Sequence, residues 1–322
     1  MDIQSWIRVS SVVGAGVSMG FGAIGSAVGE GYAAGCANEA MSRRPDMYND
    51  IARTMLLGQA VAESAAIFSL LIAMLLLFTG GSSTSPLAPF GLIAAGICMG
   101  IGAIGSGIGS GLPAGAATIG IARQPASKSQ ITTTMLIGAA ITQTSAIYSL
   151  VTSFLLIFMD YSARPFAPFW AALLGAGIST GIAAIGSGVG EGFVAQTGVE
   201  SVARNPTAMS RVVNVMMLSM AVAETTSIYG LLIAMILLFK TYPATASLAS
   251  AAALLGAGIC MGIGAIGPGI GEGLTGQQAI RWIGRNEEAT PIITRTMLVG
   301  QAVSESTGIY SLVIAFIMIF VV

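Results

Sequence analysis

Long apolar runs dominate this chain and restrict how its backbone can fold. In the segment Met55–Phe78, Glu63 is the sole charged residue. About 20 mostly apolar residues cross a bilayer as an α-helix, and a helix satisfies its own backbone groups where no water is present. Only 8% of the residues are charged, against about 25% in soluble domains. The sequence therefore predicts an all-α integral membrane protein in contact with lipid.

The apolar runs belong to an internal repeat. Gly-Ala-Ile-Gly occurs at 22–25, 102–105 and 264–267, and Ala-Ala-Ile-Gly occurs at 183–186, so the copies recur at a nearly constant interval. Each repeat has two apolar segments joined by a short polar loop, such as Arg123-Gln124-Pro125. A fixed period of this kind marks one structural unit used repeatedly. We predict eight transmembrane helices in four tandem hairpins, at 1–80, 81–160, 161–241 and 242–322.

The basic residues predict an orientation. Arg8, Arg164 and Lys240 lie near the termini and the linkers between repeats. The loops inside the repeats and their flanks hold ten basic residues: Arg43, Arg44, Arg53, Arg123, Lys128, Arg204, Arg211, Arg281, Arg285 and Arg295. Because cytoplasmic loops carry the excess of Lys and Arg, we predict that the intra-repeat loops are cytoplasmic and both termini lie outside. No basic run indicates a nucleic-acid partner.

The first helix of each repeat carries a seam of glycines. Gly16 and Gly20 are four residues apart, as are Gly258 and Gly262, so each pair shares one helix face. Small residues let helices approach closely in lipid. These seams predict an inner circle of first helices with the bulkier second helices outside, that is, a ring. The pattern Gly-x-Gly-x-x-Gly at Gly20–Gly25 lies within a transmembrane helix and does not indicate nucleotide binding.

Six glutamates lie inside the predicted spans. They form three pairs with the same separation along the chain: Glu30 with Glu63, Glu191 with Glu224, and Glu272 with Glu305. A carboxylate at mid-membrane costs roughly 2.5–3.5 kcal/mol and marks a functional site by default. Each pair is centred on its loop, so both members lie about 25 Å from the turn at ~1.5 Å per residue. We therefore expect the members of a pair to lie at one depth near the middle of the bilayer, facing one another or a neighbouring hairpin.

The second repeat lacks both carboxylates together. Ser110 and Gln143 stand at the equivalent positions. Unrelated charges would not be expected to disappear as a pair, whereas the two halves of one site would. The paired loss therefore favours a shared site in the other three repeats.

The surroundings of the pairs suggest the ligand. Two close carboxylates in a low dielectric share a proton or hold a cation. Tyr229 and Tyr310 follow their glutamates by five residues, where a phenol could donate to a carboxylate. The neighbouring hydroxyls are Ser64, Thr225, Thr226, Ser306 and Thr307. An all-oxygen set suits a hard cation, and the absence of histidine argues against zinc, haem and imidazole catalysis. A proton-shared pair that only holds helices together is the structural alternative.

These motifs resemble a known family. The glycine-rich first helix, the Arg-Gln-Pro-like loop and the segment Val303-Ser-Glu-Ser-Thr-Gly-Ile-Tyr310 are similar to the rotor-ring c subunit (proteolipid) of rotary F/V-type ATP synthases, especially its sodium-binding members. The resemblance covers essentially the whole chain, four times over. Four hairpins in one chain depart from the one or two usual in the family.

The resemblance implies roles for individual residues. Glu63, Glu224 and Glu305 match the essential carboxylates, and Glu30, Glu191 and Glu272 their first-helix partners. The resemblance implies side-chain ligands at Ser64, Thr225 and Ser306 and backbone carbonyl ligands at Val61, Val222 and Val303. It also implies that Thr226 and Thr307 anchor a water molecule. Tyr229 and Tyr310 match the tyrosine of the motif. Repeat one has Ala65 and Phe68 at the positions of the threonine and the tyrosine, so we expect its site to be weaker.

The resemblance also implies a mechanism and partners. Na⁺, or H⁺, would be the transported ion, with no cofactor and no catalytic residue in the chain. Copies of this chain or related hairpins would form a ring that turns against subunit a of the stator. The loops with Arg43, Arg44, Arg123, Arg204 and Arg285 would contact the central stalk. The repeat without carboxylates predicts a bias toward ATP-driven ion pumping, since fewer ions cross per turn.

Two other function classes make different demands on the sequence. An ion channel or secondary transporter would spread polar residues along a pathway, whereas here they gather at one depth. A structural membrane oligomer, such as a pore-forming or junction protein, would not require sodium-dependent carboxylates.

Overall fold

The computed structural model describes residues 2–79, 85–245 and 247–321 and is all-helical. Within these ranges, eight helical segments are long and apolar enough to cross a membrane, which confirms the prediction. The helices are α1 Ile3–Arg43, α2 Tyr48–Thr79, α3 Ala88–Arg123, α4 Lys128–Ile141, α5 Thr144–Phe158, α6 Phe166–Arg204, α7 Met209–Phe239, α8 Leu248–Ile283 and α9 Thr290–Phe320. Short 3₁₀ turns at Pro45–Met47, Pro125–Ser127, Pro206–Ala208 and Glu287–Ala289 lead into the second helix of each pair.

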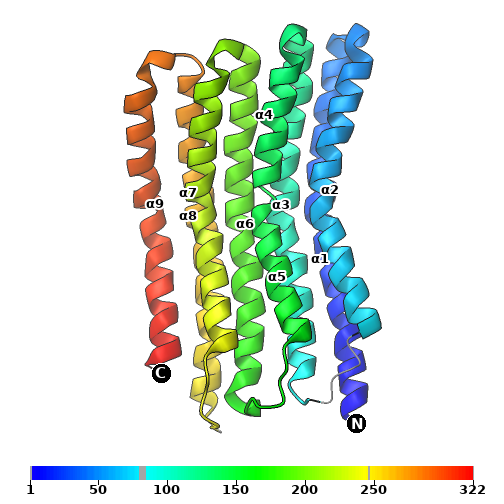
Figure 1. Cartoon of the computed structure of the whole chain (residues 1–322), viewed down its shortest axis with the longest axis vertical. Helices are drawn as coiled ribbons and strands as arrows, with labels where there is room; N and C mark the ends of the chain where they lie inside the picture. Colours follow the sequence, from blue (N-terminus) through cyan, green and yellow to red (C-terminus); the bar gives the residue numbers. More distant parts are fainter. Residues whose placement is uncertain (1, 80–84, 246, 322) are drawn as a thin grey trace.

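The helices form four hairpins that stand side by side (Figure 1). We call α1–α2 hairpin 1, α3 with α4–α5 hairpin 2, α6–α7 hairpin 3 and α8–α9 hairpin 4. The loops inside the hairpins lie at one end of the molecule and both termini lie at the other (Figure 1). We call these the loop end and the terminal end. The expected boundary between the first two hairpins, at 80/81, lies outside the described residues.

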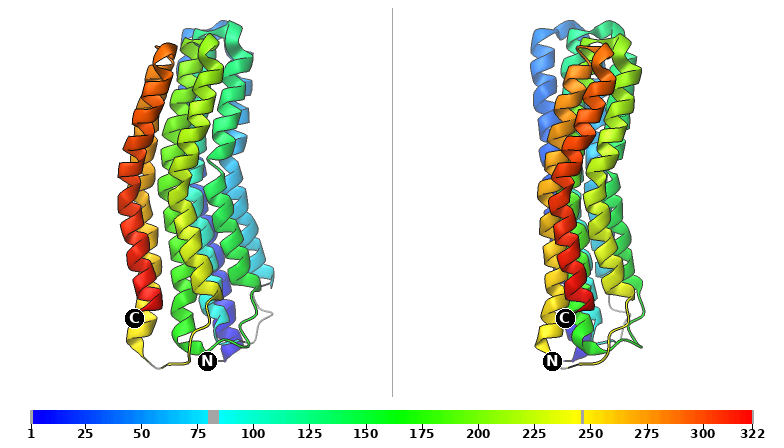
Figure 2. Two further views of the ribbon diagram at one scale, coloured as in Figure 1. Left: turned by 60° about the vertical axis from the view of Figure 1, so that its left-hand side comes forward. Right: turned by 90° about the vertical axis from the view of Figure 1, so that its left-hand side faces the viewer.

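The first helices form an inner row in the order α1, α3, α6, α8. Each packs extensively on the next, and the second helices of hairpins 1, 2 and 3 also contact the inner helix of the following hairpin. The views in Figure 2 show the long axes of the hairpins running nearly parallel. Glycines permit the close approach: a Cβ on Gly188 would lie 2.6 Å from the carbonyl carbon of Gly105, and one on Gly192 would lie 2.5 Å from the Cα of Gly109. The seams of α3, α6 and α8, which include Gly258 and Gly262, are thus contact surfaces of the inner row, whereas a Cβ on Gly16 or Gly20 of α1 meets no described atom within 4 Å.

Hairpin 2 differs from the others in its outer helix. Helix α4 ends at Ile141 and α5 begins at Thr144, so the break falls on Thr142 and Gln143. The equivalent positions in the other hairpins, Glu63, Glu224 and Glu305, lie within the uninterrupted helices α2, α7 and α9. The outer helix is therefore broken where the carboxylate is replaced.

Candidate ion-binding sites

The carboxylate pairs come together as the spacing predicts. In each pair the inner-helix and outer-helix glutamates are near enough to repel each other electrostatically. Glu191 on α6 and Glu272 on α8 are both 0% exposed. Among the described residues, none of their four carboxylate oxygens has a hydrogen-bond partner. A buried carboxylate without a partner is costly, so these oxygens fit a shared proton or a bound cation.

At the junction between hairpins 3 and 4, the groups around Glu305 come from both hairpins. The Thr225 Oγ1 of α7 lies 2.8 Å from Glu305 Oε1 on α9 and 2.8 Å from the carbonyl oxygen of Val222. The Tyr229 hydroxyl donates to the same Oε1. These contacts bring two hydroxyls of hairpin 3 to a carboxylate of hairpin 4, and the Val222 carbonyl oxygen lies beside the same Thr225 hydroxyl. Tyr229 and Thr225 thus form hydrogen bonds with the carboxylate of the next hairpin, Glu305, and not with Glu224 in their own hairpin.

The junction between hairpins 2 and 3 repeats part of this arrangement. Tyr148 Oη donates to Glu224 Oε1 at 2.6 Å, and Thr144 Oγ1 donates to the carbonyl oxygen of Ile141 at 2.8 Å. The sequence reasoning missed Tyr148 because its hairpin has no carboxylate. Its position, one repeat period before Tyr229, was the signal that could have found it. Hairpin 2 therefore lacks a carboxylate pair but donates to the pair of hairpin 3.

At the level of the carboxylates, hairpin 2 brings neutral groups to its junction with hairpin 1. Ser110 Oγ lies 2.7 Å from Thr142 Oγ1. The Gln143 amide donates to the Ser106 carbonyl oxygen at 3.4 Å and also to Ser110 Oγ. Phe68 of α2, at the position of Tyr148 and Tyr229 in the repeat, has no hydroxyl to offer. The phenylalanine thus belongs to the junction that also lacks carboxylates.

The remaining predicted residues lie at the two open edges of the molecule. In hairpin 1, Glu63 is exposed and Glu30 is half-buried, and Ser64 Oγ donates to the Val61 carbonyl oxygen at 2.6 Å. In hairpin 4, Ser306 Oγ donates to the Val303 carbonyl oxygen at 2.7 Å, and Tyr310 is 66% exposed.

Thr226 and Thr307, the positions matched to a water anchor, bond within their own helices, and Thr226 is buried whereas Thr307 is exposed. Their hydroxyls donate to the carbonyl oxygens of Ala223 and Ser304, each at 3.2 Å.

The loop end carries the predicted arginines. Arg43 pairs with Glu39 at 2.6 Å and Arg44 with Asp46 at 2.8 Å. Arg204 lies 3.5 Å from Glu200, and the Arg285 guanidinium lies 4.7 Å from the ring centroid of Trp282. Arg123 is exposed. Cationic side chains therefore gather at one end of the molecule and remain accessible to a partner.

Comparison with known proteins agrees with this architecture. The profile of the family of the ATP synthase C subunit matches four times, at residues 13–76, 93–156, 174–237 and 255–318. The A-type ATP synthase subunit K of Methanocaldococcus jannaschii is 31% identical over 232 residues, which are 72% of this chain and 96% of that protein.

Shorter relatives match part of the chain. The ATP synthase c subunit of Thermotoga petrophila is 59% identical over 68 residues, 21% of this chain and 80% of its own length. That of Natranaerobius thermophilus is 51% identical over 78 residues, 24% of this chain and 90% of its own length. With four matches to the family profile along its length, this chain belongs to the family of the ATP synthase C subunit.

Proposed function

We propose that this rotor protein binds ions at three sites, one for each carboxylate pair, and that each site is formed where two hairpins meet. As a member of its family, the chain is a non-catalytic membrane component of an ion-translocating rotor ring. The observation that carries the proposal is at the junction of hairpins 3 and 4. There Thr225 and Tyr229 of one hairpin reach Glu305 of the next, beside the buried, unpartnered Glu272.

Na⁺ is the ion that this donor set suits best. The available ligands are carboxylate, hydroxyl and backbone carbonyl oxygens, which hard cations prefer. With two carboxylates per site, a proton retained on one of them would leave a single negative charge to balance Na⁺. H⁺ alone, carried on the same pair, is the second candidate and uses the same residues. The predicted ligands in our proposal are Glu30, Glu63, Glu191, Glu224, Glu272 and Glu305, with the hydroxyls and carbonyls named above.

Tyrosine hydroxyls donate to the glutamate of the next hairpin, and this changes what we expect of the Glu30–Glu63 site. By the same geometry, Phe68 would face Gln143 and not Glu63. It would lie at the junction of hairpins 1 and 2, which we call the silent junction because hairpin 2 brings no carboxylate to it. We therefore propose that the lack of a tyrosine in hairpin 1 leaves the Glu30–Glu63 site unaffected.

The silent junction sets the coupling ratio. With three carboxylate pairs in four hairpins, a ring made of this chain moves three ions for every four hairpins that pass the stator. Each charge that crosses the membrane is worth about 2.3 kcal/mol per 100 mV. Fewer ions per turn give less energy for synthesis but allow a steeper gradient when ATP drives pumping, so we propose a bias toward pumping. The ions moved per ATP test this, and a ratio equal to the number of hairpins divided by three contradicts it.

The orientation of the chain in the membrane is proposed from its basic residues and from its family. We propose that the loop end is cytoplasmic, where its arginines contact the central stalk, and that the termini lie on the outer side. The outer helices would pass the stator a subunit. The hairpin ranges 1–80, 81–160, 161–241 and 242–322 are the corresponding units. Cysteine accessibility at Ser42 and Ser162, one at each end of the molecule, would test this orientation.

Carbodiimide labelling tests the ion-binding role. Reconstituted rings are treated with dicyclohexylcarbodiimide, and modified peptides are quantified by mass spectrometry. We expect Glu63, Glu224 and Glu305 to react and Na⁺ to slow that reaction, while the loop residue Glu287 serves as an internal control. A channel, a secondary transporter or a purely structural oligomer gives no such pattern. Labelling that is absent, or indifferent to Na⁺ and pH, contradicts the proposal.

A further inference from the structure

Gln301 is a buried polar residue of α9 that the ligand set proposed above does not include. It precedes Glu305 by four residues, so the two side chains lie on one face of the helix. Gln301 is 0% exposed. Its Nε2 donates to the Glu272 carbonyl oxygen at 3.1 Å, and to the carbonyl oxygen and Oγ of Ser219 at 3.2 and 2.9 Å. One amide therefore joins α9 to both α7 and α8.

These partners determine which way the amide points. Two of the three are backbone carbonyl oxygens, which accept hydrogen bonds and cannot donate them. The NH₂ group must therefore face Ser219 and Glu272, and Oε1 faces away from them. This Oε1 is buried and has no hydrogen-bond partner among the described residues. A buried acceptor without a partner is costly, so the position predicts a ligand for this oxygen.

The neighbouring residue Glu272 has the same need. Both of its carboxylate oxygens also lack partners in the described part of the chain, and the Gln301 amide lies against its main chain. Three buried acceptor oxygens thus belong to two residues in contact. A hard cation can satisfy such a group together, because it binds carboxylate and amide oxygens in one shell.

Packing alone does not require an amide at this position. The repeat places Met220 here in hairpin 3 and Ala139 in hairpin 2. Met220 is fully buried, and its apolar side chain leaves no polar atom without a partner. Methionine and glutamine are both unbranched and similar in length, so the fold accommodates either. An amide that keeps one buried oxygen unpaired therefore indicates a role beyond packing.

The hairpin 3–4 junction is shaped to hold this amide. At the hairpin 2–3 junction, a Cβ on Gly138 would lie 2.6 Å from the Cβ of Ala195 on α6. At the hairpin 3–4 junction the two sizes are exchanged, with Ser219 in place of the glycine and Gly276 in place of the alanine. A Cβ on Gly276 would overlap the Ser219 hydroxyl. The hydroxyl that bonds to Gln301 therefore occurs where the facing helix leaves room for it.

Gln59 repeats part of this arrangement in hairpin 1. It is the residue equivalent to Gln301, and its Nε2 donates to the Glu30 carbonyl oxygen at 3.1 Å. The same bond thus links the outer helix to the inner-helix glutamate in both hairpins that have the glutamine. The carboxylate pairs of hairpins 1 and 4 therefore have an amide beside them, whereas that of hairpin 3 has Met220.

Building on the proposed ion-binding function, we propose that Gln301 determines ion specificity at the Glu272–Glu305 site and that its amide oxygen belongs to the oxygen shell of the bound Na⁺. Ser219 is a positioning residue that acts through Gln301. A metal cation gathers several oxygen ligands, whereas a proton is held by one or two. An added neutral oxygen therefore favours Na⁺ over H⁺.

Replacing the amide by its natural counterpart tests the proposal. Rings with Gln301→Met are labelled with dicyclohexylcarbodiimide over a range of Na⁺ concentrations, and the half-protecting concentration of each glutamate is measured by mass spectrometry. The value for Glu305 should rise about tenfold, the effect of one lost polar contact, and the value for Glu224 should not change. Ser219→Ala keeps the backbone acceptor and should raise the value for Glu305 less.

The reverse exchange is the matched variant. Met220→Gln, combined with Gly138→Ser and Ala195→Gly, transfers the arrangement to the hairpin 2–3 junction. It should lower the half-protecting Na⁺ concentration of Glu224 and leave that of Glu305 unchanged. A glutamine that only held helices together would not produce this gain.

Labelling without Na⁺ separates a ligand from a structural role. In sodium-free buffer, Gln301→Met should leave both the rate of Glu305 labelling and its dependence on pH unchanged. A changed rate or a shifted pH profile would mean that the amide acts on packing or on the proton, and the assigned specificity would be wrong.

The outcomes distinguish this inference from the function on which it rests. Unchanged sodium protection of Glu305 in Gln301→Met, or of Glu224 in the reverse exchange, contradicts the role of the amide and leaves the ion-binding proposal standing. If Na⁺ protects neither glutamate in the unmodified chain, the ion-binding proposal itself fails.

Discussion

The junction between hairpins 1 and 2 and the junction between hairpins 3 and 4 use the same backbone arrangement for opposite purposes. At the first, Gln143 and Ser110 bond to each other and to nearby neutral groups. At the second, Glu305 accepts from Thr225 and Tyr229 while both oxygens of Glu272 lack partners among the described residues. A neutral junction is stable without a ligand, whereas the acidic one requires a proton or cation.

The contrast also shows that a site belongs to a junction and not to a hairpin. Hairpin 2 has no carboxylate pair, yet its Tyr148 donates to Glu224 of hairpin 3. Hairpin 1 has a carboxylate pair, yet its Phe68 lies on the side of the silent junction. A junction that has a carboxylate pair on one hairpin therefore has a tyrosine on the preceding hairpin, and the junction without the pair has a phenylalanine there.

The largest expected effect comes from converting the acidic junction toward the neutral one. Glu305→Gln removes the outer carboxylate of the pair, so Glu272 can keep a proton and no negative charge is left to balance Na⁺. We expect equilibrium binding of radioactive sodium to fall from three ions to two per chain. The loop variant Glu287→Gln should retain three. Three ions bound by Glu305→Gln would contradict the placement of a site at this junction.

The reverse conversion should require both halves of the junction. Gln143→Glu alone should leave sodium binding at three per chain, since Ser110 and Phe68 still offer neither carboxylate nor phenol. The triple variant Gln143→Glu, Ser110→Glu and Phe68→Tyr should bind a fourth ion. A fourth ion in the single variant would show that the outer carboxylate suffices.

A smaller effect should distinguish a site between hairpins from a site within one. A hydrogen bond to a charged group contributes about 1.5–3 kcal/mol, so Tyr229→Phe should weaken sodium protection of Glu305 by at least about tenfold and spare Glu224. Tyr148→Phe should do the converse. Site-resolved carbodiimide labelling measures both. If Tyr229→Phe weakened the sodium protection of Glu224 instead, the tyrosine would act on the glutamate of its own hairpin, and the site would not lie between hairpins.

The smallest effect is expected at the loop end. The Lys128–Asp50 pair is partly exposed, and such pairs contribute about 0–1 kcal/mol. Lys128→Gln should lower the temperature at which purified chains lose helicity by at most a few degrees, and added salt should remove the difference. A large loss that persists in high salt would mean that this pair decides the packing of hairpins 1 and 2.

The sequence predicted the helices of this fold well. Apolar length and the regular repeat period gave eight spans, and the spacing of Glu191 and Glu224 about their loop gave one common depth. The lateral partner was not predictable in the same way. Tyr229 is at a similar depth to Glu224 and Glu305, and the period alone cannot tell which one a side chain reaches. That choice depends on how α7 is rotated against α6 and α8, which packing decides.

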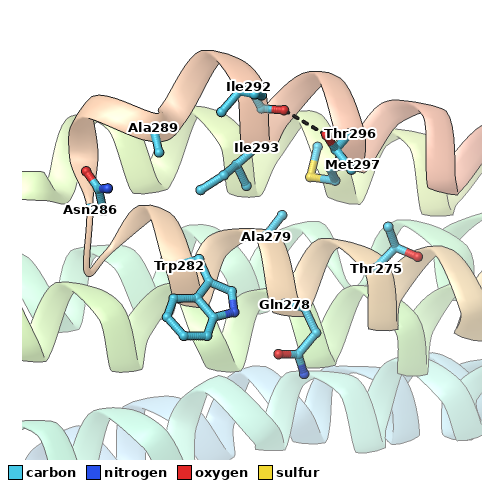
Figure 3. A pocket seen from close by; sticks show the side chains of 10 residues that line it. All are labelled: Thr275, Gln278, Ala279, Trp282, Asn286, Ala289, Ile292, Ile293, Thr296 and Met297. Carbon is cyan, nitrogen blue, oxygen red and sulfur yellow. Dashed lines mark hydrogen bonds between the residues drawn. The ribbon is translucent and has the colours of Figure 1, made fainter.

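Two other features escaped the sequence analysis. The break between α4 and α5 falls at Thr142 and Gln143, in the polar run Thr142–Ser145, which was expected to lie within one continuous helix. A groove lined by Trp282 and Met297 lies between α8 and α9 (Figure 3), on the edge of hairpin 4 that no other described hairpin of the chain covers. Each depends on contacts between segments distant in sequence, which periodicity does not reveal.

The covalent order of the hairpins has a further consequence for the proposed rotor. Because hairpins 1 to 4 are one polypeptide, the hairpin without a carboxylate pair cannot change its place among the others. In a ring built from copies of this chain, loaded positions would follow one another at intervals of two hairpins, one hairpin and one hairpin. Rotation would then proceed as one long stride and two short ones per chain, and a marker attached to the ring would show unequal angular steps in single-molecule recordings.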